Sequence, residues 1–302
     1  MEPLIIECAL NEQVTRSSTP HVPITTEEIV EDALAAVAGA SIIHFHARDP
    51  ATGALLHPGT ESYRETMRAI RRVDPDVILY PTYGSSPTPE ERFSHLEALA
   101  LDPEIRLDCA TIDPGAVNYA DYDPERNELG WDFVLSVSHA EARHFFELAP
   151  ADTASDTASP VASLGHVRHV LVYRRLGWVD DPLFVKVVLS EHHAWGMPPS
   201  EEAIRILTRG MIPEDVPYRW MVYVEGASHA PLARHAVERG GHVRTGVGDN
   251  PLFEGARLSN AEQVTRVVEM ARAIGRSVAG PEETRRLLAG KPAAARGTAG
   301  RT

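Results

Sequence analysis

The chain is poor in cysteine, in positive charge and in long apolar runs. Its 302 residues include two cysteines, Cys8 and Cys109, which lie in separate apolar runs. We therefore expect buried, reduced thiols rather than a disulfide framework. Asp and Glu number 43 against 29 Lys and Arg, which gives a formal net charge of -14. An acidic chain of this kind is a poor partner for nucleic acid or for an anionic membrane surface.

The first residues lack the features of a targeting segment. The stretch MEPLIIECALNE has neither a basic region nor a long apolar stretch. It therefore predicts no signal peptide and no transmembrane helix, and we expect a cytoplasmic protein. What is present, 43% hydrophobic and 24% charged residues, is the composition of a globular protein with a large core.

Short apolar runs alternate with amphipathic runs along most of the chain. Capping signals mark several helix starts, such as Thr25 with Glu28 and Ser259 with Glu262. Between these helices the apolar runs predict eight strands. The expected strands cover residues 4–10, 41–47, 77–82, 105–112, 161–164, 183–189, 219–226 and 241–250.

This alternation predicts a (β/α)₈ barrel of the α/β class. Eight βα units in about 250 residues are the usual size of that fold. A doubly wound parallel sheet is the alternative, because strand counts from one sequence are uncertain. We expect residues 1–280 to form the single barrel and residues 281–302 to be a C-terminal extension. The tail AGKPAAARGTAGRT, rich in Gly, Ala and Arg, predicts partial disorder there.

Two histidines, His44 and His46, lie two residues apart at the end of the second expected strand, before Arg48 and Asp49. Alternate side chains of a strand share a face, so both imidazoles point inward at the end of the barrel where active sites lie. Two such imidazoles can bind one metal ion, and Zn²⁺ accepts nitrogen ligands readily. The spacing alone does not decide between a metal site and two hydrogen-bonded structural histidines.

The glycine-rich stretch GGHVRTGVGDNP at residues 240–251 does not predict a dinucleotide site. It lacks the third glycine, and Asn250-Pro251 does not begin the required helix. Arg244 and Asp249 lie at the end of the last expected strand. There a guanidinium can hold a carboxylate substrate or orient an acid/base group. A surface ion pair is the other reading that the spacing allows.

Three segments together resemble the β-keto acid cleavage enzymes: PITTEEIVEDALAAVAGASIIHFHARDPATG, GHVRHVLVYRRLGWVDDPLF and GGHVRTGVGDNP. The resemblance extends from about Leu4 to Ile274. It implies a (β/α)₈ barrel, one divalent metal ion, normally Zn²⁺, and usually a homotetramer. It also implies condensation of a β-keto acid with acetyl-CoA, which gives acetoacetate and a new acyl-CoA.

The resemblance implies roles for individual residues. His44 and His46 match the two metal histidines of the family, and Arg244 and Asp249 match its acid/base dyad. In the family, the dyad is thought to begin the reaction by removing a proton. Attack on the thioester, CoA transfer and a retro-Claisen cleavage follow. The residues that match substrate contacts are Thr82 in YPTYG and Asp113 in ATIDPG.

The chain departs from the family at two carboxylates. The family's third metal ligand is a glutamate just before the dyad aspartate, and Gly248 stands there; a second family carboxylate, on the first loop, is matched by Gln13. Three protein ligands are usual for catalytic zinc. We therefore hypothesise that Glu225, at the end of the seventh strand, supplies the missing oxygen. Other donors near expected strand ends are Glu7, Glu12, Glu191, His192 and His193.

Two other functions stay open on the sequence. A metal-dependent hydrolase of the amidohydrolase type also carries His-x-His, with further ligands that His166, His192 and Asp249 would supply. Its pair lies on the first strand, whereas the pair here lies on the second. The other alternative is a family member that lost its carboxylate ligand and binds without turnover. The identity of the keto acid is not readable from the sequence.

Overall fold

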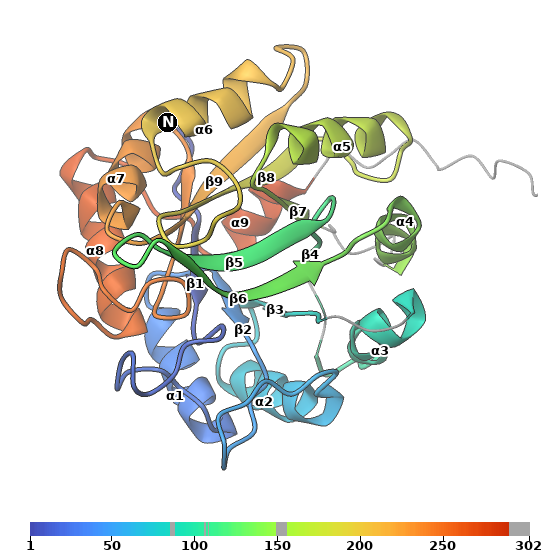
Figure 1. Ribbon diagram of the computed structural model, residues 1–302. Helices are drawn as coiled ribbons and strands as arrows, with labels where there is room; N and C mark the ends of the chain where they lie inside the picture. The colour runs from blue at the N-terminus through green and yellow to red at the C-terminus, as the bar shows by residue number, and fades with distance from the viewer. Residues whose placement is uncertain (85–87, 106, 108, 149–155, 290–302) are drawn as a thin grey trace, which may run out of the picture.

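Eight parallel strands form one curled sheet (Figure 1). The computed structural model describes the chain except for residues 85–87, 106, 108, 149–155 and 290–302. The strands are β1 (Ile6–Ala9), β2 (Ile42–Phe45), β3 (Ile78–Pro81), β4 (Cys109–Thr111), β7 (Asp156–Val161), β8 (Leu183–Ser190), β9 (Tyr218–Glu225) and β10 (His242–Thr245). Their order is β3-β2-β1-β10-β9-β8-β7-β4, and the two edge strands β3 and β4 lie side by side. The expected (β/α)₈ barrel is confirmed.

A helix on the outside of the barrel follows each strand (Figure 1). The helices are α1 (Thr26–Ala36), α2 (Thr60–Val73), α3 (Pro89–Ala100), α4 (His139–Leu148), α5 (Leu164–Arg175), α6 (Glu201–Arg205) with the π-helix η1 (Ile206–Gly210), α7 (His229–Arg239) and α8 (Asn260–Ala273). The predicted capping boxes of Thr25 with Glu28 and of Ser259 with Glu262 begin α1 and α8. None of the described helices has the length and hydrophobicity needed to span a bilayer.

The barrel interior has an apolar floor beneath a polar layer. A ninth helix, α9 (Pro281–Leu288), lies behind the strands in Figure 1. Its Leu288 packs with inward side chains of the floor. These are Ile5, Ile42, Ile78, Tyr80, Phe184, Met221 and Ala279. Glu7 lies two residues after Ile5 and points to the same face, and it is paired with Arg244 in the sheet register. Charged side chains therefore begin directly above the floor.

An antiparallel hairpin, β5 (Val117–Asp123) and β6 (Glu128–Leu135), crosses the front of the barrel in Figure 1. It interrupts the fourth βα unit and is not among the eight expected strands. Its first strand is bonded to the loop after β8, since Tyr122 N donates to His192 O at 2.8 Å and Ala194 N donates to Ala120 O at 2.8 Å. The hairpin thus forms a wall at the end of the barrel that carries the polar residues.

The fifth barrel strand was expected over residues 161–164, and that range is wrong. The strand is β7, and Ser163 already caps helix α5 by accepting a hydrogen bond from the backbone of His166. The composition of this stretch, rich in Ala, Ser and Thr, gives little hydrophobic periodicity to locate the strand. Of the two cysteines, Cys8 is a buried free thiol, and the side chain of Cys109 lies outside the described part of the chain.

Candidate metal centre and active site

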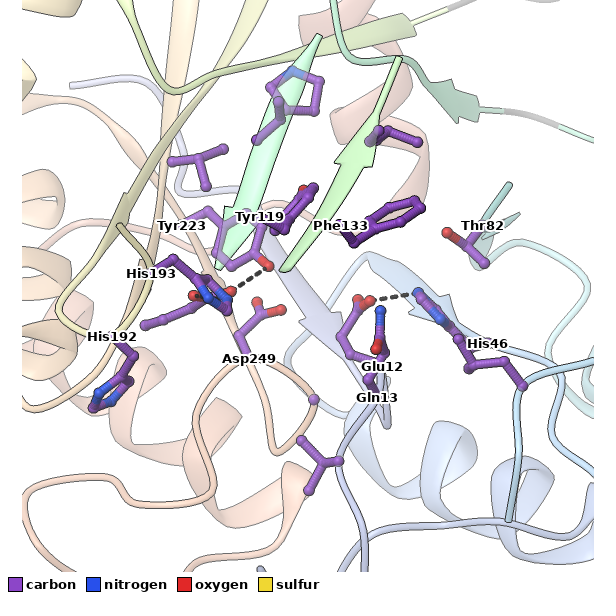
Figure 2. Close-up of a pocket in the computed structure, with 18 of the residues that line it drawn as sticks. Glu12, Gln13, His46, Thr82, Tyr119, Phe133, His192, His193, Tyr223 and Asp249 are labelled. Carbon is purple, nitrogen blue, oxygen red and sulfur yellow. Dashed lines mark hydrogen bonds and ion pairs between the residues drawn. The ribbon is translucent and has the colours of Figure 1, made fainter. Parts of the chain in front are cut away.

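A cavity of about 1190 Å³ lies at the carboxyl ends of the barrel strands (Figure 2). The loops after β1 and β2, strands β3 and β9, and the hairpin all contribute to its walls. It brings together every site residue expected from the sequence. These are His44, His46, Thr82, Asp113, Arg244 and Asp249.

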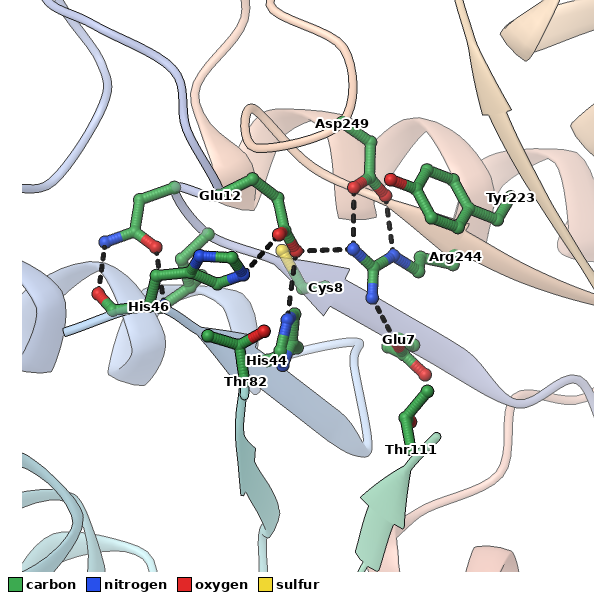
Figure 3. Close-up of polar contacts among 12 residues, drawn as sticks. Glu7, Cys8, Glu12, His44, His46, Thr82, Thr111, Tyr223, Arg244 and Asp249 are labelled. Carbon is green, nitrogen blue, oxygen red and sulfur yellow. Dashed lines mark hydrogen bonds and ion pairs between the residues drawn. The ribbon is translucent and has the colours of Figure 1, made fainter. Parts of the chain in front are cut away.

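Three side chains form a candidate metal centre at one wall of this cavity. Glu12, in the loop after β1, lies between His44 and His46 (Figure 3). Its Oε1 is 3.1 Å from His44 Nε2, and its Oε2 contacts His46 Nε2. One donor atom from each of the three residues lies within 4.8 Å of the others. Two nitrogens and one carboxylate oxygen are a common ligand set for catalytic Zn²⁺.

The hydrogen bonds of His44 favour a metal cation at this position. His44 Nδ1 lies 3.1 Å from the carbonyl oxygen of Tyr80, which can only accept, so Nδ1 carries the ring proton. Burial lowers the pKa of His44 to about 4, so the ring is neutral near pH 7. Its Nε2 lone pair therefore faces the Glu12 carboxylate, and the two repel unless a cation lies between them. The residues present fit a divalent metal.

The loop that carries Glu12 is held in a strained conformation. Glu12 has a φ of 32°, in the left-handed region that a glutamate rarely adopts. Arg48 donates to the carbonyl oxygens of Glu12 at 2.6 Å and Val14 at 2.9 Å. Asn11 accepts from His46 N at 2.8 Å and donates to His46 O at 3.0 Å. Arg48 and Asn11 thus fix the Glu12 loop to the end of β2, where His44 and His46 lie.

Gly248 makes room for Glu12. A Cβ atom at this position would lie 2.7 Å from Glu12 Cγ and 2.9 Å from both the Ala9 carbonyl oxygen and the Asn11 nitrogen. A side chain at residue 248 is therefore incompatible with Glu12 in its observed position. The observed position of Glu12 is therefore compatible with glycine at residue 248 and not with the glutamate of the family pattern.

The hypothesis that Glu225 supplies the third donor is corrected by the structure. Its Oε1 accepts a hydrogen bond from Tyr223 at 2.9 Å, and its Oε2 lies 3.1 Å from His193 Nε2. Figure 2 shows Tyr223 and His193 across the cavity from His46, with Asp249 and Glu12 between them. Gln13 lines the cavity, but the carboxylate of this loop enters one residue earlier, at Glu12.

Arg244 and Asp249 form a buried bidentate pair (Figure 3). Arg244 Nε and Nη2 each donate to one oxygen of Asp249 at 2.7 Å. Nη2 also donates to Glu12 at 2.5 Å, and Nη1 donates to Glu7 at 3.0 Å and to the Tyr80 hydroxyl at 3.1 Å. A guanidinium has five N–H donors, and these five acceptors match them. Arg244 is therefore built to orient protein groups rather than to bind a substrate carboxylate.

Asp249 has the proton affinity of a general base. Burial raises its pKa to about 7, against the opposing charge of Arg244. The negative charges of Glu12 and Glu225 act in the same direction as burial. A carboxyl group with this pKa can accept and return a proton near neutral pH.

Thr82 and Asp113 line the same cavity. Asp113 accepts a hydrogen bond from the Tyr83 hydroxyl at 2.5 Å, and burial raises the pKa of its carboxyl group. His166, a ligand in the hydrolase alternative, instead lies with Nε2 3.3 Å from the Ala116 carbonyl oxygen. Among the described residues, neither His166 nor His192 joins the candidate metal group.

Tyr80 and Tyr223 were not identified from the sequence. Tyr80 stacks on His44 with ring centroids 4.3 Å apart, and Arg244 Cζ lies 4.3 Å above the ring of Tyr223. The available signal was the alternation of side chains along a strand. Tyr80 lies two residues before Thr82 and Tyr223 two residues before Glu225, so each tyrosine shares the inward face of its strand with a polar residue. Apolar packing gives the same pattern, so parity alone does not separate a site tyrosine from a core tyrosine.

Comparisons with known proteins match nearly the whole chain. A family model described as beta-keto acid cleavage enzyme matches residues 3–289. The chain is 31% identical over 292 residues to a 3-keto-5-aminohexanoate cleavage enzyme of Fusobacterium nucleatum, covering 95% of this chain and 98% of that protein. It is 29% identical over 309 residues to a 3-dehydrocarnitine:acetyl-CoA trimethylamine transferase of Rhizobium meliloti, covering 94% and 96%.

A solved structure supports the fold. A 3-dehydroquinate dehydratase of Geobacillus kaustophilus superposes with a TM-score of 0.55 at 14% sequence identity, covering 91% of this chain and 93% of that one. At this level of identity the likeness concerns the barrel architecture and carries no information about the reaction.

Proposed function

The chain belongs to the beta-keto acid cleavage enzyme family, and on that premise we propose that it condenses a β-keto acid with acetyl-CoA. The products are acetoacetate and a new acyl-CoA. The observation that carries the proposal is the meeting of two groups in one cavity. Glu12, His44 and His46 form the candidate metal centre, and Glu12 shares Arg244 with the proton acceptor Asp249.

We propose that Glu12, His44 and His46 hold a divalent metal, with Zn²⁺ as the ion that best fits two nitrogens and one oxygen. When bound, such an ion supplies Lewis acidity that polarises the keto and carboxylate oxygens of the substrate. His44 is oriented for this role by its bond to the Tyr80 carbonyl, and Glu12 by Arg244. Thr82 and Asp113, farther along the wall, would contact the substrate.

Asp249 begins the proposed reaction by taking a proton from the carbon between the keto and carboxylate groups. This carbon attacks the thioester carbonyl of acetyl-CoA, and the CoA thiolate leaves. The thiolate then attacks the original keto carbon, and the bond between that carbon and its acidic neighbour breaks. The acyl-CoA forms, and the acetoacetate carbanion regains its proton from Asp249, so the enzyme returns to its starting state.

The charge of the cavity restricts how the substrates enter. Its described lining residues include seven carboxylates, those of Glu12, Asp113, Asp121, Asp123, Glu125, Glu225 and Asp249, and one guanidinium, that of Arg244. Away from the proposed metal centre, a field of this sign repels phosphates and carboxylates. We therefore propose that only the thioester arm of acetyl-CoA enters the cavity. We also propose that the far end of the keto acid is neutral or cationic rather than a second carboxylate.

The test is a panel of β-keto acids with acetyl-CoA, run on metal-stripped protein before and after addition of zinc. We expect a new acyl-CoA and acetoacetate in equal amounts, zinc-dependent rates, and 3-oxohexanoate consumed faster than 3-oxoadipate. Ester or amide hydrolysis without any need for CoA would instead support the amidohydrolase alternative. Bound zinc with no turnover across the panel would support a binding protein.

We further propose that the protein works as a homotetramer in the cytoplasm. Strand β6 leaves Leu129 61% and Val134 59% exposed. Apolar side chains gathered on one hairpin are typical of an interaction surface. Light scattering coupled to size-exclusion chromatography measures the oligomeric state directly.

A further inference from the structure

A buried ion pair lies beneath the active site and takes no part in the steps above. Lys186, on β8, is 1% exposed, and Glu7, on β1, is fully buried. Lys186 Nζ lies 2.6 Å from Glu7 Oε2 and 2.9 Å from Oε1. The chain has two lysines, Lys186 and Lys291. A lysine is rarely fully buried unless it is paired, so this position needs a physical explanation.

Lys186 and Glu7 form the base of a network that reaches both parts of the site (Figure 3). Lys186 Nζ lies 2.7 Å from the Tyr80 hydroxyl, and that hydroxyl donates to Glu7. Glu7 in turn accepts from Arg244. Through its ring and its carbonyl oxygen, Tyr80 also supports His44. Neither Lys186 nor Glu7 lines the cavity, so neither touches the substrate.

Three carboxylates compete for one guanidinium in this network. Arg244 donates to Asp249 and Glu12 on the cavity side and to Glu7 on the floor side. If Glu7 carried its charge alone, it would draw the guanidinium towards the floor. Lys186 neutralises Glu7, which leaves more of the Arg244 charge for the two cavity carboxylates.

We propose that Lys186 is a positioning residue that acts through Glu7 and Tyr80, and that it determines how Arg244 divides its charge between the floor and the cavity carboxylates. The effect on catalysis rests on the proposed condensation, whereas the effect on zinc affinity rests only on the proposed metal site at Glu12, His44 and His46. A purely structural pair is the competing explanation, since buried ion pairs often contribute little to stability compared with apolar replacements.

The experiment compares Lys186→Met, Glu7→Gln and the double variant with the wild type. In Lys186→Met, Arg244 is drawn to Glu7, so the pKa of Asp249 rises and zinc binds more tightly near the less neutralised Glu12. In Glu7→Gln a competing carboxylate is lost, so the pKa of Asp249 falls and zinc binds less tightly. We expect shifts of roughly half a pH unit in the acid limb of kcat/KM and about threefold in zinc affinity. The double variant restores both towards wild type.

Zinc affinity is measured by competition with a chelating dye, and it needs no turnover. Circular dichroism and thermal melting establish that each variant is folded, and the double variant, which leaves no unpaired charge, keeps the test valid if Lys186→Met alone unfolds. Changes of the same sign in both single variants, or no recovery in the double variant, overturn the proposal. The expected zinc shifts without any turnover by the wild type would overturn the proposed function alone.

Discussion

Glu12 is the residue on which the candidate metal centre depends. It places one carboxylate oxygen at each of the two histidines and accepts from Arg244. We expect Glu12→Gln to lower zinc affinity by about 100-fold or more, because the charged third ligand is lost. Metal content per chain after dialysis against a fixed free zinc concentration is the measurement.

Glu225→Gln is the matched control for this experiment. It removes the charge of a carboxylate in the same cavity that contacts Tyr223 and His193 rather than the metal histidines. Its zinc content should stay at the wild-type level. A loss of zinc equal to that of Glu12→Gln would restore the original hypothesis of a Glu225 ligand.

Asp249 is expected to control the pH dependence of the reaction. Its carboxyl group must be ionised to take a proton, and burial raises its pKa to about 7. The rate constant kcat/KM should therefore fall as the pH drops through an apparent pKa at or somewhat below 7, since a bound divalent cation favours the ionised form. Asp249→Asn should lose about 10²- to 10⁴-fold in kcat/KM.

Steady-state kinetics between pH 5 and pH 9 test this assignment. In Asp249→Asn the residual activity should no longer show the acid limb, while zinc content is retained. An acid limb that persists unchanged in the variant would assign the essential base to another group.

At the scale of elements, Gly248 is the position where the loop after β10 meets the Glu12 loop. A Cβ atom there would meet Glu12 Cγ at 2.7 Å and the Ala9 carbonyl oxygen at 2.9 Å. Because one of these neighbours is backbone, Gly248→Ala should displace the Glu12 loop. We expect about 1–3 kcal/mol of lost stability and weaker zinc binding, measured by chemical denaturation and chelator competition.

Gly165→Ala is the control for a glycine-to-alanine change. Gly165 lies in the first turn of α5, where an added Cβ would meet Ser163 Oγ at an ordinary 3.6 Å. Its stability and zinc affinity should stay close to wild type. If Gly248→Ala also bound zinc normally, the steric link between Gly248 and Glu12 would be wrong.

The hairpin of β5 and β6 is joined to the barrel by a histidine that lies between two carboxylates. His193 lies with Nδ1 2.8 Å from Asp121 on β5 and Nε2 3.1 Å from Glu225 on β9. Although burial opposes it, Glu225 and Asp121 raise the pKa of His193. The stabilisation from this protonated ring is therefore complete at low pH and is lost as the pH rises through the raised pKa.

We expect His193→Asn to loosen the hairpin without unfolding the barrel. Hydrogen exchange of the β5 amides should be faster in the variant at pH 6, and the difference from wild type should shrink as the pH rises from 6 to 9 and the wild-type ring loses its proton. Amides of β1 and β2 provide the internal reference. If the exchange rates of variant and wild type differed equally at both pH values, the charge of the His193 ring would not be what holds the hairpin.

The sequence allowed the barrel elements to be predicted wherever local chemistry determines them. The capping boxes at Thr25 and Ser259 and the inward parity of His44 and His46 depend on neighbours a few residues away. The placement of Glu12, rather than Glu225, beside the two histidines does not depend on near neighbours in the sequence. It depends on a left-handed φ at Glu12 and on the space left by Gly248, which lies 236 positions farther along the chain. Local patterns carry no information about such an approach.

For the molecule as a whole, the charged layer of the barrel rests on the apolar floor that α9 closes. Glu7, Lys186 and Arg244 are all at most 5% exposed, one strand step above floor residues such as Ile5 and Phe184. The floor keeps water from this layer from below, and the low local dielectric strengthens the charge interactions that hold the site. Residues outside the expected barrel range, in α9, thus complete its interior.

A substitution in α9 that weakens the floor should therefore lower the stability of the protein without changing its zinc affinity. Leu288 is 4% exposed and packs into the floor, whereas its neighbour Leu287 is only partly buried against it. We expect Leu288→Ala to cost about 2–4 kcal/mol of unfolding free energy through lost burial and a cavity, and Leu287→Ala clearly less. Urea denaturation measures both. Zinc affinity should be unchanged in both variants, because the floor residues that pack with Leu288 include none of Glu12, His44 or His46. A parallel loss of zinc in Leu288→Ala would mean that the floor also positions the metal ligands.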